Sequence, residues 1–291
     1  MKISENLIGA SFMSASMAAF VINDTLMKFV GPDLGVLQSI FARGLFATAF
    51  MGCVAYFSGA FQQMPTPADA QRIALRTVAE IGATFCFVVA LFNLPLANVT
   101  AVLQSLPLTI ALAAAIFLGE AISWRRTMAI AIGAIGVLII IRPASGAFNG
   151  YALLALAAVG FVTFRDLIVR RFSPSVSSLF VAFVTAATVT LTSGIALAFV
   201  GQWVPIDLKT TGMLALAAVF VLLGYYFSIA TMRFGEVAMV TPFRYTAVFW
   251  AILFGWLVFE QVPDGWTVLG ILIILITGLY TLWRDWKMGR Q

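Results

Sequence analysis

Long apolar runs, separated by short polar connectors, follow one another along the whole chain. Most of them reach about 18 residues or more, which is enough for a helix to cross the hydrocarbon core of a bilayer. A soluble fold of this size could not bury so many helices that are apolar on every side. The pattern therefore predicts an all-α integral membrane protein with ten transmembrane helices. Their expected ranges are 6–27, 34–57, 76–92, 97–119, 127–141, 151–169, 178–200, 210–232, 237–259 and 265–283.

The basic residues divide unevenly between the two sides that ten spans create. Of the 17 lysines and arginines, only Lys28, Arg142 and Lys209 fall on the side away from the termini, and Arg43 and Arg244 lie within spans. The other side receives Lys2, Arg72, Arg76, Arg125, Arg126, Arg165, Arg170, Arg171, Arg233, Arg284, Lys287 and Arg290. Cytoplasmic loops carry an excess of such residues, so we expect both termini in the cytoplasm of a bacterial inner membrane. The formal net charge of +5 then needs no nucleic-acid partner.

The chain also repeats itself at an interval of about 140 residues. A shift of 142 aligns Asp24 with Asp166, Lys28 with Arg170 and Pro32 with Pro174, and a shift of 140 aligns Gln104 with Arg244 and Glu120 with Glu260. We expect two units, 1–143 and 144–291, each with five spans. Because five is odd, the second unit must enter the membrane inverted. Inverted repeats are typical of secondary transporters, whose substrate site lies near the midplane between the halves.

Several short motifs carry a family resemblance. Asn23-Asp24-Thr25-x-x-Lys28 ends the first span, and Gly119-Glu120 and Phe259-Glu260 close the fourth and ninth. With the ten-span repeat, they resemble the EamA-type transporters of the drug/metabolite transporter superfamily over nearly the whole chain. Together with Thr241-Pro242-Phe243-Arg244-Tyr245, they look most like a branch that includes S-adenosylmethionine uptake carriers. The same superfamily contains amino-acid exporters and riboflavin importers, so the resemblance implies a fold and a family but no single substrate.

Charged and amide side chains lie deep within three spans. Arg43 lies near the middle of the second, Arg244 about two turns into the ninth, and Gln104 at the matching position of the fourth, where Pro107 should kink the helix. A charge inside a span costs about 2.5–3.5 kcal/mol on insertion scales and points to function. We therefore expect these side chains to face a polar cavity in which an arginine binds a carboxylate or phosphate of the substrate.

The alternative for the two arginines is a structural ion pair, Arg43 with Asp24 and Arg244 with Glu80. Asp24 and Glu80 are also the candidate coupling residues, because the middle of the first span, FMSASM, holds no acid. Small multidrug transporters of the superfamily carry an acid there, so its absence argues against antiport of cationic drugs. Facilitated diffusion, exchange, and coupling through Asp24 or Glu80 remain.

Aromatic side chains within spans could stack on a planar part of the substrate, and small residues recur on two helices. The aromatic candidates are Tyr225, Tyr226, Tyr245 and Trp250. The small residues are Ala111, Ala115 and Gly119 in the fourth span and Ala247, Ala251 and Gly255 in the ninth. Small-xxx-small faces let helices approach closely in lipid. We expect the fourth and ninth helices to pack together where the halves meet, or else each on a neighbour in its own half.

The sequence favours a secondary transporter over a membrane enzyme or signalling subunit. There is no histidine, the acids are dispersed, and no GxxxxGK[ST] sequence for ATP-driven transport is present. We expect no cofactor and no metal, and a monomer or weak homodimer in the lipid bilayer. The favoured function is export of a small polar or zwitterionic, amino-acid-like metabolite by alternating access. The alternative is uptake of S-adenosylmethionine or a riboflavin-like cofactor.

Overall fold

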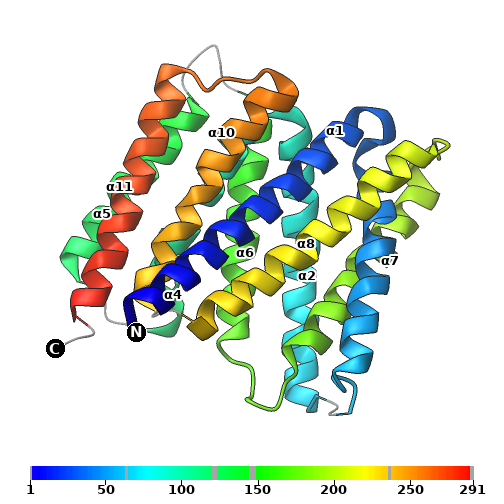
Figure 1. The fold of residues 1–291 in the computed structure, drawn as a ribbon, viewed down its shortest axis with the longest axis horizontal. Coiled ribbons are helices and arrows are strands. Elements are labelled where there is room, and N and C mark those ends of the chain that lie inside the picture. Colours follow the sequence, from blue (N-terminus) through cyan, green and yellow to red (C-terminus); the bar gives the residue numbers. More distant parts are fainter. Residues whose placement is uncertain (1, 63–64, 120–122, 144–148, 235–236, 289–291) are drawn as a thin grey trace.

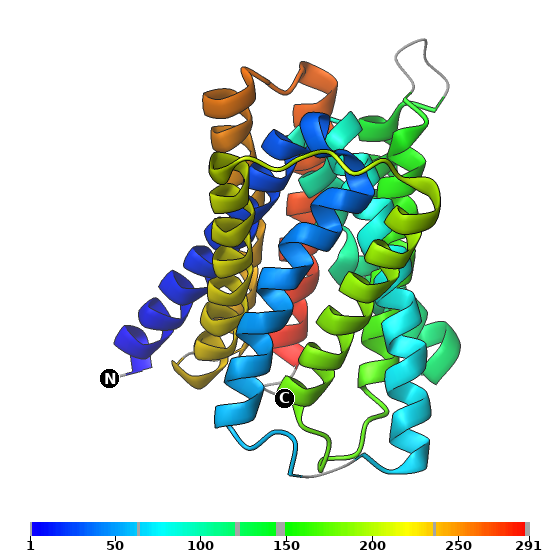
Figure 2. The ribbon, with the colours of Figure 1, turned by 90° about the vertical axis from the view of Figure 1, so that its right-hand side faces the viewer.

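The apolar runs fold into a bundle of helices, with both chain termini at the same end of it (Figures 1 and 2). We call this end the terminal end and the opposite one the far end. The computed structural model describes residues 2–62, 65–119, 123–143, 149–234 and 237–288, and within these ranges every regular element is helical. The elements are α1 (Lys2–Phe57), α2 (Pro67–Asn93), α3 (Leu96–Leu103), α4 (Leu106–Leu118), α5 (Trp124–Ile141), α6 (Tyr151–Val169), α7 (Ser178–Val200), α8 (Leu208–Phe234), α9 (Val237–Val240), the 3-10 helix η1 (Thr241–Tyr245), α10 (Thr246–Phe259) and α11 (Gly265–Met288).

These elements make ten crossings of the bundle. Helix α1 contains two, because the chain reverses direction at Gly35, where φ is 70°, a left-handed conformation that favours glycine. Helices α3 and α4 together form the fourth crossing, and α9, η1 and α10 form the ninth. The other crossings are single helices that are long and apolar enough to span a membrane. The predicted fold class, an all-α membrane protein with ten spanning helices, is confirmed.

Prolines break two of the crossings. Helix α3 gives way at Gln104 and Ser105, and α4 restarts with Pro107 in its first turn, which confirms the expected kink. In the ninth crossing, Pro242 stands at the start of η1, between α9 and α10. Proline has no N–H to donate, so it fits the first turn of a new helix better than the interior of an old one. Both crossings are therefore interrupted in mid-course, the fourth by a turn and the ninth by a 3-10 helix.

The predicted boundaries hold well at some helices and less well at others. The sixth and seventh crossings have the expected ranges. The first two crossings are separate helices, as predicted, but the first continues beyond Met27 through Pro32 as far as the bend at Gly35. The third begins at Pro67 rather than Arg76, since the Thr66 hydroxyl accepts a hydrogen bond from the Asp69 N–H and caps the helix there.

Equivalent helices of the two halves pack against each other in opposite directions. The second crossing of α1 packs on α7. The Phe41 ring covers Gly194 and the Phe183 ring covers Gly52, two contacts that a shift of 142 residues exchanges. Between them, the Thr48 and Thr190 hydroxyl groups, also 142 apart, lie 3.1 Å from each other in a hydrogen bond. This bond lies on a pseudo-twofold axis, and the antiparallel packing of equivalent helices shows that the repeat is inverted.

The other contacts between the halves obey the same symmetry. Helix α2 packs on α6, and the first crossing of α1 packs on α8, which is the equivalent pair. In each pair a phenylalanine ring lies against a glycine: a Cβ on Gly82 would lie 2.8 Å from Phe161, and a Cβ on Gly224 would lie 2.8 Å from Phe20. The last helices of the two halves, α5 and α11, also pack on each other. Packing thus follows the repeat throughout the bundle.

The small residues of the fourth and ninth crossings do not meet face to face. Helix α10 packs mainly on α1 and α3, and its Gly255 lies 3.9 Å, measured from an added Cβ, from Leu96 at the start of α3. Helix α4 packs mainly on α6 and α5, where Ala111 is buried, whereas Ala115 is half-buried and Gly119 is exposed as the left-handed C-cap. The two crossings do pack together, but the proline break moves the contact from α4 to α3.

Candidate functional site

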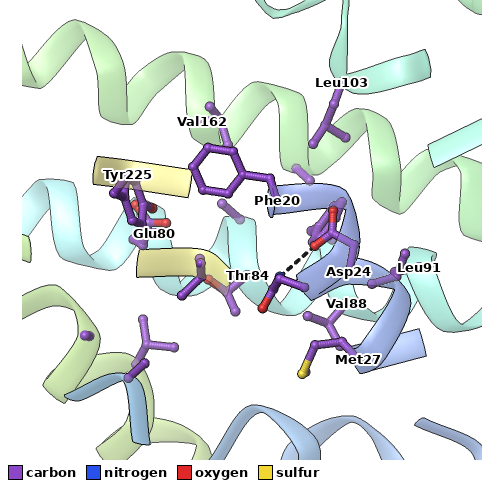
Figure 3. A pocket seen from close by; sticks show the side chains of 18 of the residues that line it. Phe20, Asp24, Met27, Glu80, Thr84, Val88, Leu91, Leu103, Val162 and Tyr225 are labelled. Atoms are coloured by element: carbon purple, nitrogen blue, oxygen red, sulfur yellow. Dashed lines mark hydrogen bonds between the residues drawn. The ribbon is translucent and has the colours of Figure 1, made fainter. Parts of the chain in front are cut away.

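A cavity of about 430 Å³ lies between the two halves. Side chains from both crossings of α1 and from α2, α3, α4, α6, α7, α8, η1 and α10 line it, whereas the described residues of α5 and α11 contribute none. Its polar lining residues are Asn23, Asp24, Arg43, Arg76, Glu80, Thr84, Thr100, Gln104, Arg165, Thr185, Thr190, Tyr225 and Arg244. Its volume is in the range of small-molecule sites. In Figure 3 the cavity extends from Glu80 and Tyr225 to Asp24 and Leu91.

A cluster of charged side chains joins the halves on the terminal-end side of the cavity. The Arg165 guanidinium donates to both carboxylate oxygens of Glu80, at 2.9 and 3.1 Å, and its Nε donates to Asp166 at 2.8 Å. Arg76 lies 3.5 Å from the same Glu80 carboxylate and donates to the Thr185 hydroxyl at 2.7 Å. Every charge in this cluster has an opposite charge beside it. The cluster thereby connects α2 of the first half with α6 and α7 of the second.

A second polar group lies toward the far end, and its bonding is different. Arg43 Nη1 donates to the Asn23 side-chain oxygen at 3.2 Å, and Asn23 Nδ2 donates to Asp24 at 2.9 Å, the hydrogen bond that is marked at Asp24 in Figure 3. Arg43 and Asp24 are therefore connected through the amide of Asn23 and form no ion pair with each other within the described chain. The buried Nε of Arg43 has no hydrogen-bond partner there.

Arg244 and Gln104 reach the cavity from the two broken crossings, at the equivalent positions that the repeat predicts. The Arg244 side chain forms no hydrogen bond and no ion pair with any other residue that the structure describes. The other three cavity arginines are all hydrogen-bonded, Arg43 as above and Arg76 and Arg165 within the terminal-end cluster. The predicted alternative partner of Arg244, Glu80, is occupied by Arg165 and Arg76. Among the described residues, Arg244 thus presents to the cavity a guanidinium fork that has no hydrogen-bonded partner.

The family model for EamA-like transporters matches residues 7–142 and again residues 149–283, most of the chain. The chain belongs to the EamA-like transporter family. It is a transporter, and its relatives are named as transporters rather than enzymes.

This EamA-like transporter is similar over nearly its whole length to curated bacterial proteins that move different metabolites. It is 24% identical to the pseudopaline exporter CntI of Pseudomonas aeruginosa, covering 93% of this chain and 95% of that protein. It is 26% identical to the S-adenosylmethionine uptake transporter of Rickettsia conorii, and 25% identical to the riboflavin transporter of Vibrio cholerae; each match covers 98% of this chain and 96% of the relative. One crystal structure matches with a TM-score of 0.60, at 16% identity and 96% coverage of both chains, which supports the fold.

The EamA-like transporter brings together some of the predicted site residues and separates others. Arg43, Gln104, Tyr225 and Arg244 line the cavity, as do the coupling candidates Asp24 and Glu80. Three aromatic candidates lie elsewhere. Tyr226 is 65% exposed, Tyr245 is buried with its hydroxyl toward Gly278 of α11, and Trp250 packs between Phe249 and Phe254. Tyr225 pairs edge-on with Phe20 at 5.2 Å between ring centroids, and these two rings and Phe87 form the aromatic part of the described cavity wall.

Sequence reasoning assigned Arg76 and Arg165 to the topology-setting charges, and this interpretation is corrected. Both line the cavity and are only partly exposed, with 16% and 20% of the side chain accessible. For Arg165, the repeat contained evidence of a role at the cavity. Asn23, the residue of the first half that aligns with Arg165, belongs to the motif of the first span.

Two basic residues on the far side have structural roles. Buried Lys28 donates to the Leu91 and Leu94 carbonyl oxygens at 2.6 Å each and so completes the last turn of α2. Arg142, at the end of α5, forms an ion pair with Asp264 at the start of α11. Lys28 and Arg142 are thus bound by neighbouring carbonyl and carboxylate groups. These local bonds explain why two basic residues lie at the far end, where the charge asymmetry predicts few.

Proposed function

We propose that this EamA-like transporter exports a small zwitterionic, amino-acid-like metabolite by alternating access, with Arg244 binding the carboxylate. The observation that carries the proposal is the free guanidinium of Arg244 on the cavity wall. A guanidinium fork fits a carboxylate in two parallel hydrogen bonds, and the gain is large where water is scarce. The other arginines of the wall already have partners.

The charge of the wall supports a substrate with an anionic group. Four arginines face two carboxylates, Asp24 and Glu80, so the described lining carries a formal excess of two positive charges. The position of Arg244 supports the same assignment, because η1 interrupts the ninth crossing beside it. In inverted-repeat transporters, interrupted helices near the midplane form the substrate site.

The proposal includes an orientation and a division of the chain. Both termini are placed in the cytoplasm, supported by the excess of basic residues at the end where both termini lie (Figure 1). The halves are placed at 1–143 and 144–291, supported by the contacts that a shift of 142 exchanges. Three points remain predictions: that both termini are cytoplasmic, that the protein lies in the inner membrane, and that it is a monomer or weak homodimer.

A second candidate is uptake of S-adenosylmethionine or a riboflavin-like cofactor. It is favoured by the Phe20 and Tyr225 rings on the cavity wall, against which a planar ring could stack. Relatives of both kinds are similar over nearly the whole chain. The extra sulfonium charge of S-adenosylmethionine fits the positive excess of the wall less well than a simple zwitterion does.

The test is binding and transport by the Arg244→Gln variant, which carries the residue of the equivalent position, Gln104. The purified protein is screened by thermal shift against amino acids, S-adenosylmethionine and riboflavin. The compound that stabilises it most is then used for titration and for flux in liposomes. Loss of a charged hydrogen-bonded pair should weaken binding by about 1.5–3 kcal/mol, roughly 10- to 150-fold, with Arg244→Lys between wild type and Gln.

The matched control is Arg171→Gln, which removes an exposed arginine beyond the end of α6. It should bind and transport as wild type does. A folded Arg244→Gln protein with wild-type affinity and flux would contradict the assignment of Arg244. Stabilisation by riboflavin or S-adenosylmethionine and by no amino acid would favour the second candidate. The direction of flux is measured with inside-out and right-side-out vesicles.

A further inference from the structure

Two aspartates occupy the same position in the two halves but have different neighbours. Asp24 and Asp166 are 142 residues apart, and the residue before each is Asn23 in the first half and Arg165 in the second. Asp166 forms an ion pair with Arg165 at 2.8 Å. Asp24 accepts one hydrogen bond, from the neutral amide of Asn23, and forms no ion pair with any residue in the described ranges. One member of the pair thus has a directly bonded cation, whereas the other has its nearest cation, Arg43, only across the Asn23 amide.

Arg43, held one amide away by Asn23, is the positive charge that acts on Asp24, and it forms no direct ion pair with it in the described ranges. Its carboxylate lies on the cavity wall among Phe20, Met27, Val88 and Leu91 (Figure 3). An ionised carboxylate in such apolar surroundings loses hydration and gains little in return, so a bound cation or proton stabilises it.

Charged and titratable groups on the surrounding elements are committed elsewhere or face other parts of the cavity. On α1, Arg43 bonds to Asn23 rather than to Asp24, and Lys28, one turn further along, bonds to carbonyl groups of α2. On α2 and α6, Arg76, Glu80 and Arg165 bond to one another or to their neighbours at the other end of the cavity. Tyr225 of α8 and Arg244 of η1 also line the cavity, and neither is hydrogen-bonded to Asp24.

We propose that Asp24 is an exchange site, which holds the ammonium group of the substrate in one stage of transport and a proton in another. The inference rests on the proposed function and deepens it, since a zwitterion needs an anion as well as the cation at Arg244. Of the two carboxylates on the described wall, Glu80 already faces two arginines and only Asp24 is available. Because ammonium and proton compete for one carboxylate, a proton moves inward for each substrate that moves outward. The balance is one proton against one zwitterion.

The proton site can be tested without a substrate, by infrared spectroscopy of the purified protein. At about pH 6, exposed aspartate and glutamate side chains are ionised, so the carbonyl band of a protonated carboxylic acid reports a buried site. Wild type should show this band, and Asp24→Asn should lack it. Asp166→Asn is the matched control at the equivalent position and should keep it. Absence of the band in wild type, or its persistence in Asp24→Asn, would overturn the proposal.

A second variant leaves the acid in place. Asn23→Arg gives Asp24 the neighbour that Asp166 has, and the carboxylate should then stay ionised and the band disappear. Retention of the band in a folded Asn23→Arg protein would contradict the inference that Asp24 takes up a proton because it lacks a directly bonded cation.

The exchange itself is tested with the amino acid that stabilises the protein most in the thermal-shift screen. Its binding should release about one proton per protein into a weakly buffered solution, and Asp24→Asn should release none and bind at least 10-fold more weakly. Binding without proton release would refute the exchange while leaving the proposed function intact. Failure of every amino acid to bind would refute the proposed function, and the infrared band would still decide whether Asp24 holds a proton.

Discussion

The two sides of the cavity are equivalent in backbone and packing but not in charge. Gly82 and Gly224 each receive a phenylalanine ring at the same distance. Glu80, two residues before Gly82, aligns with Leu222, two residues before Gly224. On the terminal-end side the Glu80 carboxylate therefore meets Arg165 across the two halves, whereas on the other side Leu222 and Asn23 provide no charges. The comparison shows that a symmetric frame can carry an asymmetric site when a few side chains differ.

The largest effect is expected from breaking the charged side. Glu80→Gln leaves Arg165 and Arg76 without their shared carboxylate. Removing one partner of a buried pair costs about 3–5 kcal/mol, and we expect about 3 kcal/mol, the low end, because both side chains keep some access to the cavity. The measurement is thermal or denaturant unfolding in detergent. The Glu80→Gln/Arg165→Gln double variant should recover part of the loss, and wild-type stability of the single variant would show that the cluster contributes little.

An intermediate and equal effect is expected where the two sides match. Gly82→Ala and Gly224→Ala each place a methyl group 2.8 Å from a phenylalanine ring. Overpacking of this kind costs roughly 1–3 kcal/mol, and the two variants should lose similar amounts in the same unfolding assay. Gly160→Ala, where no atom lies within 4 Å of the added Cβ, is the control. A large difference between Gly82→Ala and Gly224→Ala would contradict the equivalence of the two sides.

The smallest effect is expected at the far rim, where a second ion pair joins the halves. Hydrogen bonds from Arg142 and the Thr267 backbone hold the pKa of the Asp264 carboxyl well below its usual range. The Asp264 side chain is 54% exposed, so Arg142→Ala should cost only about 0.2–1 kcal/mol. Because the pKa of Asp264 is lower in the folded than in the unfolded state, the ionised carboxylate stabilises the folded protein at pH values above the unfolded pKa, about 3.9. This contribution is lost as the pH falls through the folded pKa. The difference from wild type should therefore be present near neutral pH and vanish in strong acid; a difference that persists in acid would contradict this.

Much of the fold was predictable because hydropathy and the repeat are both sequence properties. The sixth and seventh crossings, the kink at Pro107 and the pairing of Gln104 with Arg244 follow from them directly. The start of α2 was not predicted, because its first turns are polar and a hydropathy pattern marks only the apolar part of the helix. The cap signal Thr66-x-x-Asp69 was the available evidence.

The site was predictable only in part, because sequence position gives the depth of a side chain but not its direction. Tyr226 and Tyr225 are neighbours, yet only Tyr225 lines the cavity. Arg165 lies near a helix end, where a basic residue serves equally well at a headgroup or in a cavity. Its partner Glu80 comes from α2, 85 residues away in the chain, and only the packing of α2 on α6 brings them together.

The hydrogen bond between Thr48 and Thr190 has a consequence for how motion can be measured. Rotation about a twofold axis maps a pair of equivalent residues on that axis onto itself. If the two halves exchange their conformations, the distance between the two residues is therefore the same before and after the exchange. If transport works by such an exchange, the separation of these two side chains is an internal ruler whose length the cycle leaves unchanged. The distance between labels on α2 and α6 at one end and the distance between labels on α1 and α8 at the other would then change in opposite directions. The Thr48–Thr190 distance would serve as the constant reference.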